Sequence, residues 1–442
     1  MTPLALILLA QGYDVCGSDR SYDDGQTPDK FLMLQNMGVR LFPQDGCGLD
    51  AETTGVLVVS SAIEERIPDV KEAKRINVSI AKRAEVLSEI FHLSDCSIGI
   101  SGTSGKTTVT GMVATMLHAL DLHPTVMNGG RVTNLEDAGH AKIGSLLVGG
   151  NDYFVSEMDE SDGSIDLFTA DIAVLNNIEL DHTSLDQLKE YFQNFVDRAT
   201  RACVLNLDNE NLRGLIRPDN AVTYSILYDG GNLHATDLVP RANGIDFKVN
   251  GQDVSLNVPG EHNVSNALAA LGVAKVLGID LAQSIPALEQ FTGIKRRLET
   301  LGCSDIGVTV IDDFGHNPDK ISASLATLKE FDGRLIVMFQ PHGFAPLRMM
   351  GKKMAVAFGQ YLDDEDILCI PEVYYAGGTV DRSVTSKDFV EMIKSAGVEH
   401  VHWFDTREEI EPFIKNVLKS GDRVIIMGAR DDTLTLFAKT FL

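Results

Sequence analysis

The residues with the clearest chemical potential lie in one glycine-bearing stretch, Ile98–Thr108, which reads IGISGTSGKTT. An apolar run leads into it and apolar residues at helical spacing follow it, so we expect a loop between a buried strand and a helix. Such a loop directs backbone N–H groups and a helix N-terminus at a phosphate, while Lys106 adds a positive charge and the Thr107 hydroxyl a magnesium ligand. The stretch therefore predicts an ATP-binding loop.

This loop departs from the strict GxxxxGK[ST] pattern, because Ile100 stands where the first glycine would be. Gly102 supplies a glycine three residues before Gly105 instead. The alternative interpretation is a tight strand-to-helix turn with a surface lysine. The predicted phosphate-binding residues are Gly102, Thr103, Ser104, Gly105, Lys106, Thr107 and Thr108.

Two further predicted strands end in polar side chains. Because parallel strands present their carboxyl ends at one edge of a sheet, these side chains are expected to converge on the phosphate loop. Carboxylates and an imidazole beside a triphosphate suit Mg²⁺, although the acidic run alone is also compatible with a solvated loop. The residues are Glu157, Asp159, Glu160 and Asp162 after one strand, and Asn177, Asp181 and His182 after the next.

Strand-like and helical runs alternate along nearly the whole chain, which predicts an α/β fold with parallel sheets. Predicted strands include residues 13–17, 55–60, 97–101, 153–156, 172–176, 335–339 and 423–427. Short strands with Asn-Gly turns at Asn243 and Asn250 indicate a β-hairpin insertion between about residues 223 and 260. Changes of pattern near Asp95 and Arg297 predict three domains, 1–95, 96–297 and 298–442.

The overall charge limits the partners of the chain. Its 442 residues carry 63 acidic and 38 basic side chains, a formal net charge of -25. Such a charge disfavours broad binding to nucleic acid or to an anionic membrane, so any anionic ligand needs a local site. The six scattered cysteines lack metal-ligand spacing, no apolar run has the length of a membrane span, and the start lacks a basic n-region. We therefore expect a cytoplasmic protein with reduced thiols.

Short motifs, taken in order, resemble the Mur ligases along nearly the whole chain. In the centre they are GTSGKTT, the E-x-DESD run, NNIELDH, EHNVSNALAA and GIKRRLE. VVSSAI with KRAEVLSEI before them, and IDDFGHNP with FQPH after them, resemble the branch that acts on UDP-N-acetylmuramate. The resemblance implies a Rossmann-like N-terminal domain lacking its first strand, a P-loop ATPase central domain and a Rossmann-like C-terminal domain.

The resemblance also implies roles for single residues. Lys106 would hold the ATP phosphates, Thr107 and Glu157 would bind one Mg²⁺, and His182 would bind a second. His316 would lie near the incoming amino acid. Residues implied to contact ATP, either at the adenine or after domain closure, are His262, Asn263, Asn266, Arg296, Arg297 and Asp312; helix capping is a structural alternative for Asn263.

The implied activity is ATP-dependent joining of an L-amino acid, with L-alanine as the expected acceptor, to the lactyl carboxylate of UDP-N-acetylmuramate through an acyl phosphate. This is a step of peptidoglycan precursor synthesis, performed by a monomer or homodimer with ATP and Mg²⁺. Alternatives are a ligase that adds a recycled tripeptide to the same sugar nucleotide, a folate-type ligase, and a non-catalytic ATP-binding regulator. The motifs before the phosphate loop favour the sugar-nucleotide branch over the folate type.

The chain departs from this branch at two places. A pair of arginines that holds the acceptor carboxylate is replaced by Gly343 and Pro346, with Arg348 further on. Gly and Pro cannot replace a bidentate arginine, so Arg348 or a different acceptor must account for recognition. At the start, MTPLA matches the stretch that follows a glycine-rich loop in this branch, so Met1 is expected to be internal to a polypeptide that begins roughly ten or more residues upstream.

Overall fold

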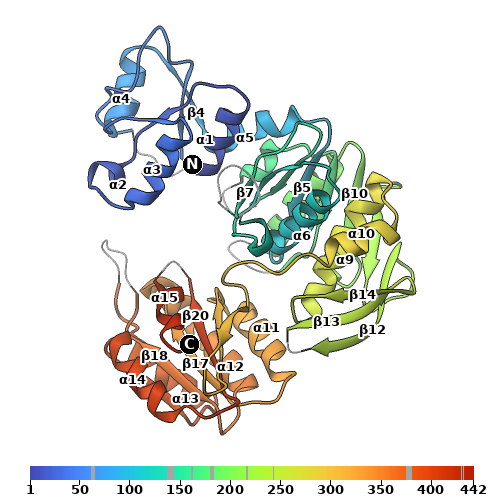
Figure 1. The fold of residues 1–442 in the computed structure, drawn as a ribbon, viewed down its shortest axis with the longest axis vertical. Coiled ribbons are helices and arrows are strands. Elements are labelled where there is room, and N and C mark those ends of the chain that lie inside the picture. The colour runs from blue at the N-terminus through green and yellow to red at the C-terminus, as the bar shows by residue number, and fades with distance from the viewer. Residues whose placement is uncertain are drawn as a thin grey trace. The chain divides into compact units, whose positions relative to one another are not determined.

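The computed structural model describes residues 1–60, 65–136, 144–160, 163–179, 184–215, 218–241, 243–374, 381–429, 431 and 433–442. They form two compact units. One comprises Met1–Leu238, Phe247–Leu256 and Asn263–Thr292, and the other Val239–Asp246, Asn257–His262 and Gly293–Leu442. Mostly parallel strands alternate with helices in both (Figure 1), which confirms the predicted α/β class. None of the described helices is long and apolar enough to cross a membrane.

The N-terminal segment contains two small parallel sheets. They are β1 (Cys16–Gly17) with β2 (Arg40–Leu41), and β3 (Val56–Val59) with β4 (Ser79–Lys82). The predicted strand at residues 13–17 is shorter than expected because the N–H of Tyr13 bonds to Leu8 O in the turn that ends the first helix. The helices are α1 (Thr2–Ala10), α2 (Arg20–Asp23), α3 (Pro28–Asn36), α4 (Pro68–Arg75) and α5 (Arg83–His92).

The central sheet has the order β14-β13-β12-β11-β10-β9-β5-β8-β6-β7. Its parallel core lies at β5 (Ser97–Ser101), where every residue is buried, paired to β8 (Phe154–Glu157) and β9 (Ile172–Leu175). The carboxyl ends of these three strands therefore meet at one edge, as predicted. The other strands of this region are β6 (Thr125–Met127), β7 (Leu146–Leu147), β10 (Ala202–Asn206) and β11 (Val222–Ser225).

Helices cover the central strands on both faces. On β10, Cys203 and Leu205 belong to the core that includes α7 (Leu185–Asp197), while Val204 faces the opposite way. A Cβ at Gly272 of α9 (Glu261–Leu277) would lie 2.4 Å from Val204 Cγ1, so α9 packs closely against that second face. The remaining helices here are α6 (Lys106–Ala119), α8 (Glu210–Arg213), α10 (Leu281–Leu288) and the 3₁₀ turns η1 (Thr133–Leu135) and η2 (Ser164–Leu167).

The predicted β insertion is present as neighbouring strands β12 (Leu233–Arg241), β13 (Gly244–Val249) and β14 (Gln252–Leu256). Asn250 and Gly251 connect β13 to β14 with φ of 49° and 83°. Left-handed conformation at both central residues is what a tight hairpin turn requires, and Asn-Gly supplies it at low cost.

The C-terminal unit contains a six-stranded sheet of order β15-β16-β20-β17-β18-β19, antiparallel only at β15/β16. Its strands are β15 (Glu299–Cys303), β16 (Thr309–Asp313), β17 (Leu335–Gln340), β18 (Ile367–Pro371), β19 (Val401–Phe404) and β20 (Arg423–Gly428).

Alternate side chains of β17 enter two different cores, which explains its continuous apolar run. Leu335, Val337 and Phe339 join the core that includes α11 (Pro318–Lys329), α12 (Phe344–Tyr361) and α13 (Ser386–Ser395). Ile336 and Met338 join the core that includes α14 (Arg407–Val417) and α15 (Leu434–Lys439). Helices on both sides therefore hold the sheet (Figure 1).

Candidate functional site

The phosphate loop connects β5 directly to α6, as predicted. Two of its glycines have conformations that other residues rarely adopt, with φ of 132° at Gly102 and 86° at Gly105. A Cβ at Gly102 would also lie 3.0 Å from the backbone nitrogen of Asn177. The loop therefore needs glycine at both positions, and its departure from the strict pattern leaves the strand–loop–helix geometry intact.

Lys106, the first residue of α6, bends back over the loop. Its Nζ donates to Gly102 O at 2.7 Å and lies 3.0 Å from Glu160 Oε2. The lysine side chain is 17% exposed and that of Glu160 is 1% exposed. The charge predicted for phosphate binding is thus at the loop, and it is paired with a buried carboxylate.

Glu157 ends β8 and lies beside Thr107. The Thr107 hydroxyl donates to Glu157 Oε2 at 2.9 Å. Burial raises the pKa of the Glu157 carboxyl, and this outweighs the Thr107 hydrogen bond and the charge of Lys106, which lower it. A hydroxyl and a carboxylate form a hard-oxygen donor pair suited to Mg²⁺. The residues present therefore fit the predicted magnesium ligands.

The other predicted metal ligand, His182, lies outside the described residues, as do Asp162 and Asp181. Within the described part of the chain, no group of three or more His, Cys, Asp or Glu side chains is arranged to hold a metal ion. A site built from Thr107 and Glu157 would leave the remaining positions on Mg²⁺ to water and phosphate oxygens, which is how this ion commonly binds.

A chain of side-chain amides supports the loop. Asn177 accepts from Ser104 N–H at 2.8 Å and donates to Ser104 O at 3.0 Å. Asn176 donates to Ser104 O and to Asn266 Oδ1, and accepts from the Tyr224 hydroxyl. The loop conformation is therefore fixed by side chains from the segment that follows β9, from β11 and from α9. Sequence reasoning missed the role of Asn176, and its only signal was its place after a buried strand.

Three residues expected near the adenine lie in different surroundings. Asn266 is buried, and its Nδ2 donates to Asn263 Oδ1 at 3.1 Å, so both belong to the amide chain behind the loop. His262 belongs to the second unit, where its ring lies beside Gly260. Contact with adenine stays a prediction for all three.

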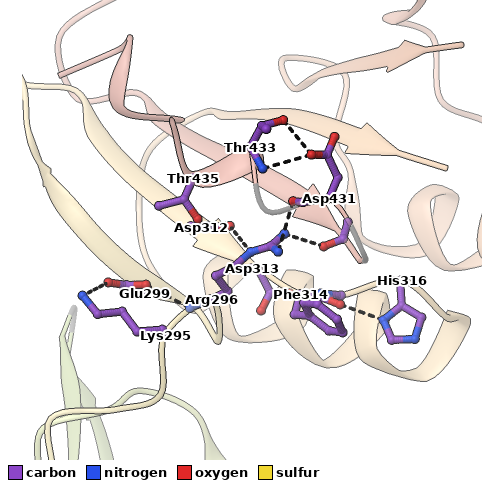
Figure 2. Close-up of polar contacts among 12 residues, drawn as sticks. Lys295, Arg296, Glu299, Asp312, Asp313, Phe314, His316, Asp431, Thr433 and Thr435 are labelled. Carbon is purple, nitrogen blue, oxygen red and sulfur yellow. Dashed lines mark hydrogen bonds and ion pairs between the residues drawn. The ribbon is translucent and has the colours of Figure 1, made fainter. Parts of the chain in front are cut away.

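In the C-terminal unit, the Arg296 guanidinium is enclosed by polar groups (Figure 2). It donates to Gly428 O at 2.8 Å, to Asp431 O at 3.2 Å and to Asp312 Oδ1 at 3.4 Å. The Asp312 side chain is fully buried, and burial raises its pKa despite hydrogen bonds from Thr435 and Arg296. Arg296 is therefore engaged in holding the strand ends of this unit together.

The adjacent Arg297 lies in a row of rings. Its guanidinium is 5.1 Å from the centre of the Phe314 ring, which meets His316 edge to face at 5.3 Å. His316 in turn meets His342 at 4.9 Å. Burial, assisted by nearby cationic groups such as Lys320, lowers the pKa of His316 to about 3, so its imidazole is neutral at physiological pH. Figure 2 shows its Nδ1 paired with Phe314 O, at 2.8 Å.

Three family descriptions match successive parts of the chain. Residues 1–94 match the Mur ligase family catalytic domain, residues 100–274 the Mur ligase middle domain, and residues 296–430 the Mur ligase glutamate ligase domain. The chain belongs to the Mur ligase family, whose members are ATP-dependent acid–amino-acid ligases. The resemblance drawn from the sequence motifs is thereby confirmed.

Individual relatives narrow the similarity to one branch. The UDP-N-acetylmuramate–L-alanine ligase of Dictyoglomus turgidum is 33% identical, with 97% of this chain and 91% of the relative covered. The same enzyme of Desulfosudis oleivorans is 34% identical over 98% and 93%. The crystal structure of UDP-N-acetylmuramate–alanine ligase from Thermotoga maritima superimposes with a TM-score of 0.79 at 26% identity, covering 100% of this chain and 95% of that one. A murein peptide ligase from Psychrobacter arcticus shares the fold, with a TM-score of 0.67 and 22% identity over 100% and 95%.

Proposed function

We propose that this chain joins an L-amino acid, with L-alanine as the first candidate, to the lactyl carboxylate of UDP-N-acetylmuramate at the expense of ATP. The observation that carries the proposal is the loop with Lys106, Thr107 and Glu157 in place, in a chain similar to alanine-adding ligases over nearly its whole length. The proposed setting is the cytoplasm, where nucleotide-linked precursors are made.

The mechanism follows from the charges that must meet. The sugar carboxylate attacks the γ-phosphate, ADP leaves, and the acceptor amine then displaces phosphate from the acyl phosphate to form an amide. Two anions must approach each other in the first step, so Lys106 and the loop N–H groups stabilise the charge on the transferring phosphoryl group. Thr107 and Glu157 would hold Mg²⁺, which supplies further charge neutralisation at the phosphates.

No covalent enzyme nucleophile is needed, and none is proposed. An amine attacks only when it is deprotonated, and a group with a pKa of about 3 is too weak a base to take the ammonium proton, which goes to water instead. We propose that the neutral imidazole of His316 positions the acceptor amine by a hydrogen bond. We include His316 in the proposed machinery for this reason.

Recognition of the acceptor depends on the start of α12. Gly343 has φ of 145° and ψ of 150° at the start of α12, a conformation in which any L side chain is strained. Nearby, Arg348 pairs with Asp381 at 3.1 Å and the Arg382 guanidinium lies 5.3 Å from the Phe344 ring centre. We propose Arg348 as the group that recognises the acceptor carboxylate; if it does, a longer acceptor such as a tripeptide remains compatible with the site.

The test is phosphate release by the purified protein with ATP, Mg²⁺ and UDP-N-acetylmuramate, across single L-amino acids and the tripeptide L-alanyl-γ-D-glutamyl-meso-diaminopimelate. Release with L-alanine alone supports the alanine-adding reaction, and release with the tripeptide alone replaces it by the recycling reaction. ATP binding without release with any acceptor would refute both and favour a regulator. In the active reaction, Arg348→Ala is expected to raise the acceptor KM about tenfold or more with little change in the KM for ATP; an unchanged acceptor KM would remove Arg348 from the site.

A further inference from the structure

The Lys106 ammonium is held from two sides before any ligand is present. Its Nζ bonds to Gly102 O at 2.7 Å and to Glu160 Oε2 at 3.0 Å. An ammonium has three N–H donors, so these two contacts leave one for a phosphate oxygen. The lysine is therefore already placed over the loop, and little side-chain freedom is lost when a nucleotide binds.

Glu160 cannot easily give up this partner. Its side chain is 1% exposed, and a buried carboxylate without a counter-charge is costly. If Lys106 swung out to meet a phosphate, it would leave that charge uncompensated. The arrangement thus favours a lysine that stays in place and a nucleotide that comes to it.

The same contact changes the charge that the loop offers. Glu160 compensates the positive charge of Lys106, and Glu157 accepts a hydrogen bond from the Thr107 hydroxyl at 2.9 Å. A triphosphate without a cation would therefore meet a neutralised lysine and further carboxylate groups. A triphosphate that carries Mg²⁺ would bring the missing positive charge to the Thr107 and Glu157 oxygens.

We infer that Glu160 is a positioning residue that fixes Lys106 over the phosphate loop and makes the loop select the magnesium-bound nucleotide against the metal-free one. The inference rests on the proposed ATP-dependent function, and it adds a second determinant of the magnesium requirement besides the metal ligands. The inference can be tested without observing the reaction, because it predicts a difference in nucleotide affinity alone.

The experiment measures the dissociation constant of ATP, with Mg²⁺ and separately with EDTA, by displacement of a fluorescent ATP analogue. The variants are Glu160→Gln, which removes the charge, and Glu160→Asp, which keeps it. Glu190→Gln makes the same change at an exposed position of α7 and serves as the matched control. Thermal unfolding of each variant identifies any that fail to fold.

We expect Glu160→Gln to tighten binding of metal-free ATP, so that the ratio of the EDTA to the Mg²⁺ dissociation constant falls by about tenfold or more. Glu160→Asp and Glu190→Gln should leave the ratio near that of the unmodified chain. Equal weakening of both forms in Glu160→Gln, with an unchanged ratio, would show a purely structural role and overturn the inference.

The proposed function can fail separately. A chain that binds nucleotide with the predicted ratios but releases no phosphate with any acceptor would refute the ligase proposal and leave the role of Glu160 standing. A chain that does not bind magnesium-bound ATP at all would refute both.

Discussion

Gly129 faces the Glu157 carboxylate so closely that a single methyl group should disable the proposed magnesium site. The Cβ of an alanine at this position would lie 2.0 Å from Glu157 Oε1 and 2.8 Å from its Cδ. Ordinary contact begins at 3.4 Å, so the carboxylate must move by about 1 Å or more. Gly129 has no left-handed φ, and the atoms in its way are the end of a flexible side chain, so the backbone should tolerate the change.

The expected result of Gly129→Ala is a folded protein with lost activity. A displacement of about 1 Å at a reacting centre costs on the order of 10²-fold in rate, and Thr107 would lose its hydrogen-bonded partner. The assay is kcat/KM for ATP as a function of Mg²⁺ concentration, beside the thermal unfolding midpoint. Gly150→Ala is the control, because only Asp152 N lies within 4 Å of its Cβ, at 3.9 Å. Activity within twofold of the unmodified chain in Gly129→Ala would refute the placement of Glu157 as a metal ligand.

Further predictions concern the pair of Lys106 and Glu160, the two adjacent arginines, and His316. Lys106→Ala should abolish ligation and also lower the free energy of unfolding in urea by about 3 kcal/mol, because Glu160 stays buried and unpaired. Adding Glu160→Gln should restore most of that stability, and no recovery would show that the two residues are not coupled. Arg296→Ala should lower the free energy of unfolding by about 2 kcal/mol through lost hydrogen bonds, and an unchanged free energy of unfolding would contradict its role at the strand ends. Arg297→Ala should raise the KM for ATP, and an unchanged KM would remove Arg297 from the ATP site. The folded-state pKa of His316, about 3, lies below its ordinary 6.5, so its contribution to stability is complete above pH 6.5 and is lost as the pH falls toward 3. His316→Gln should therefore flatten the decline of the free energy of unfolding between pH 6.5 and 4. An unchanged slope would contradict the burial of this imidazole.

The phosphate loop could be predicted because the residues that define it are adjacent in the sequence. A buried strand, two glycines, Lys106 and the following helix all fall within a short stretch, and local geometry alone places them at one point. Carboxyl ends of parallel strands meet by topology, which brought Glu157 to the loop without knowledge of its contacts. The pairing of Glu160 with Lys106 was not predicted, because an acidic run gives no sign of which carboxylate turns inward.

Contacts between distant segments account for the other differences. Asn176 and Asn266 are 90 residues apart, and nothing in either segment indicates that their amides meet behind the loop. The sequence alone does not distinguish Arg296 from the adjacent Arg297. In the structure, Arg296 has φ of 59° and its guanidinium lies among the carbonyls at the ends of the C-terminal strands. The fold thus places both guanidiniums over the Phe314 ring, 5.2 Å and 5.1 Å from its centre, and gives Arg296 hydrogen bonds to these carbonyls as well.

The two halves of the proposed reaction differ in how the chain specifies them. Phosphate recognition uses backbone N–H groups, which any residue supplies once the loop has its shape, so a relative can lose the first glycine of the pattern and keep the site. Acceptor recognition uses side chains, and at Gly343 the backbone itself has a conformation that disfavours an arginine. A change of acceptor therefore requires a different start to α12 as well as different side chains. Similarity at the phosphate loop therefore accompanies the ligase class, whereas the start of α12 and its side chains set the acceptor.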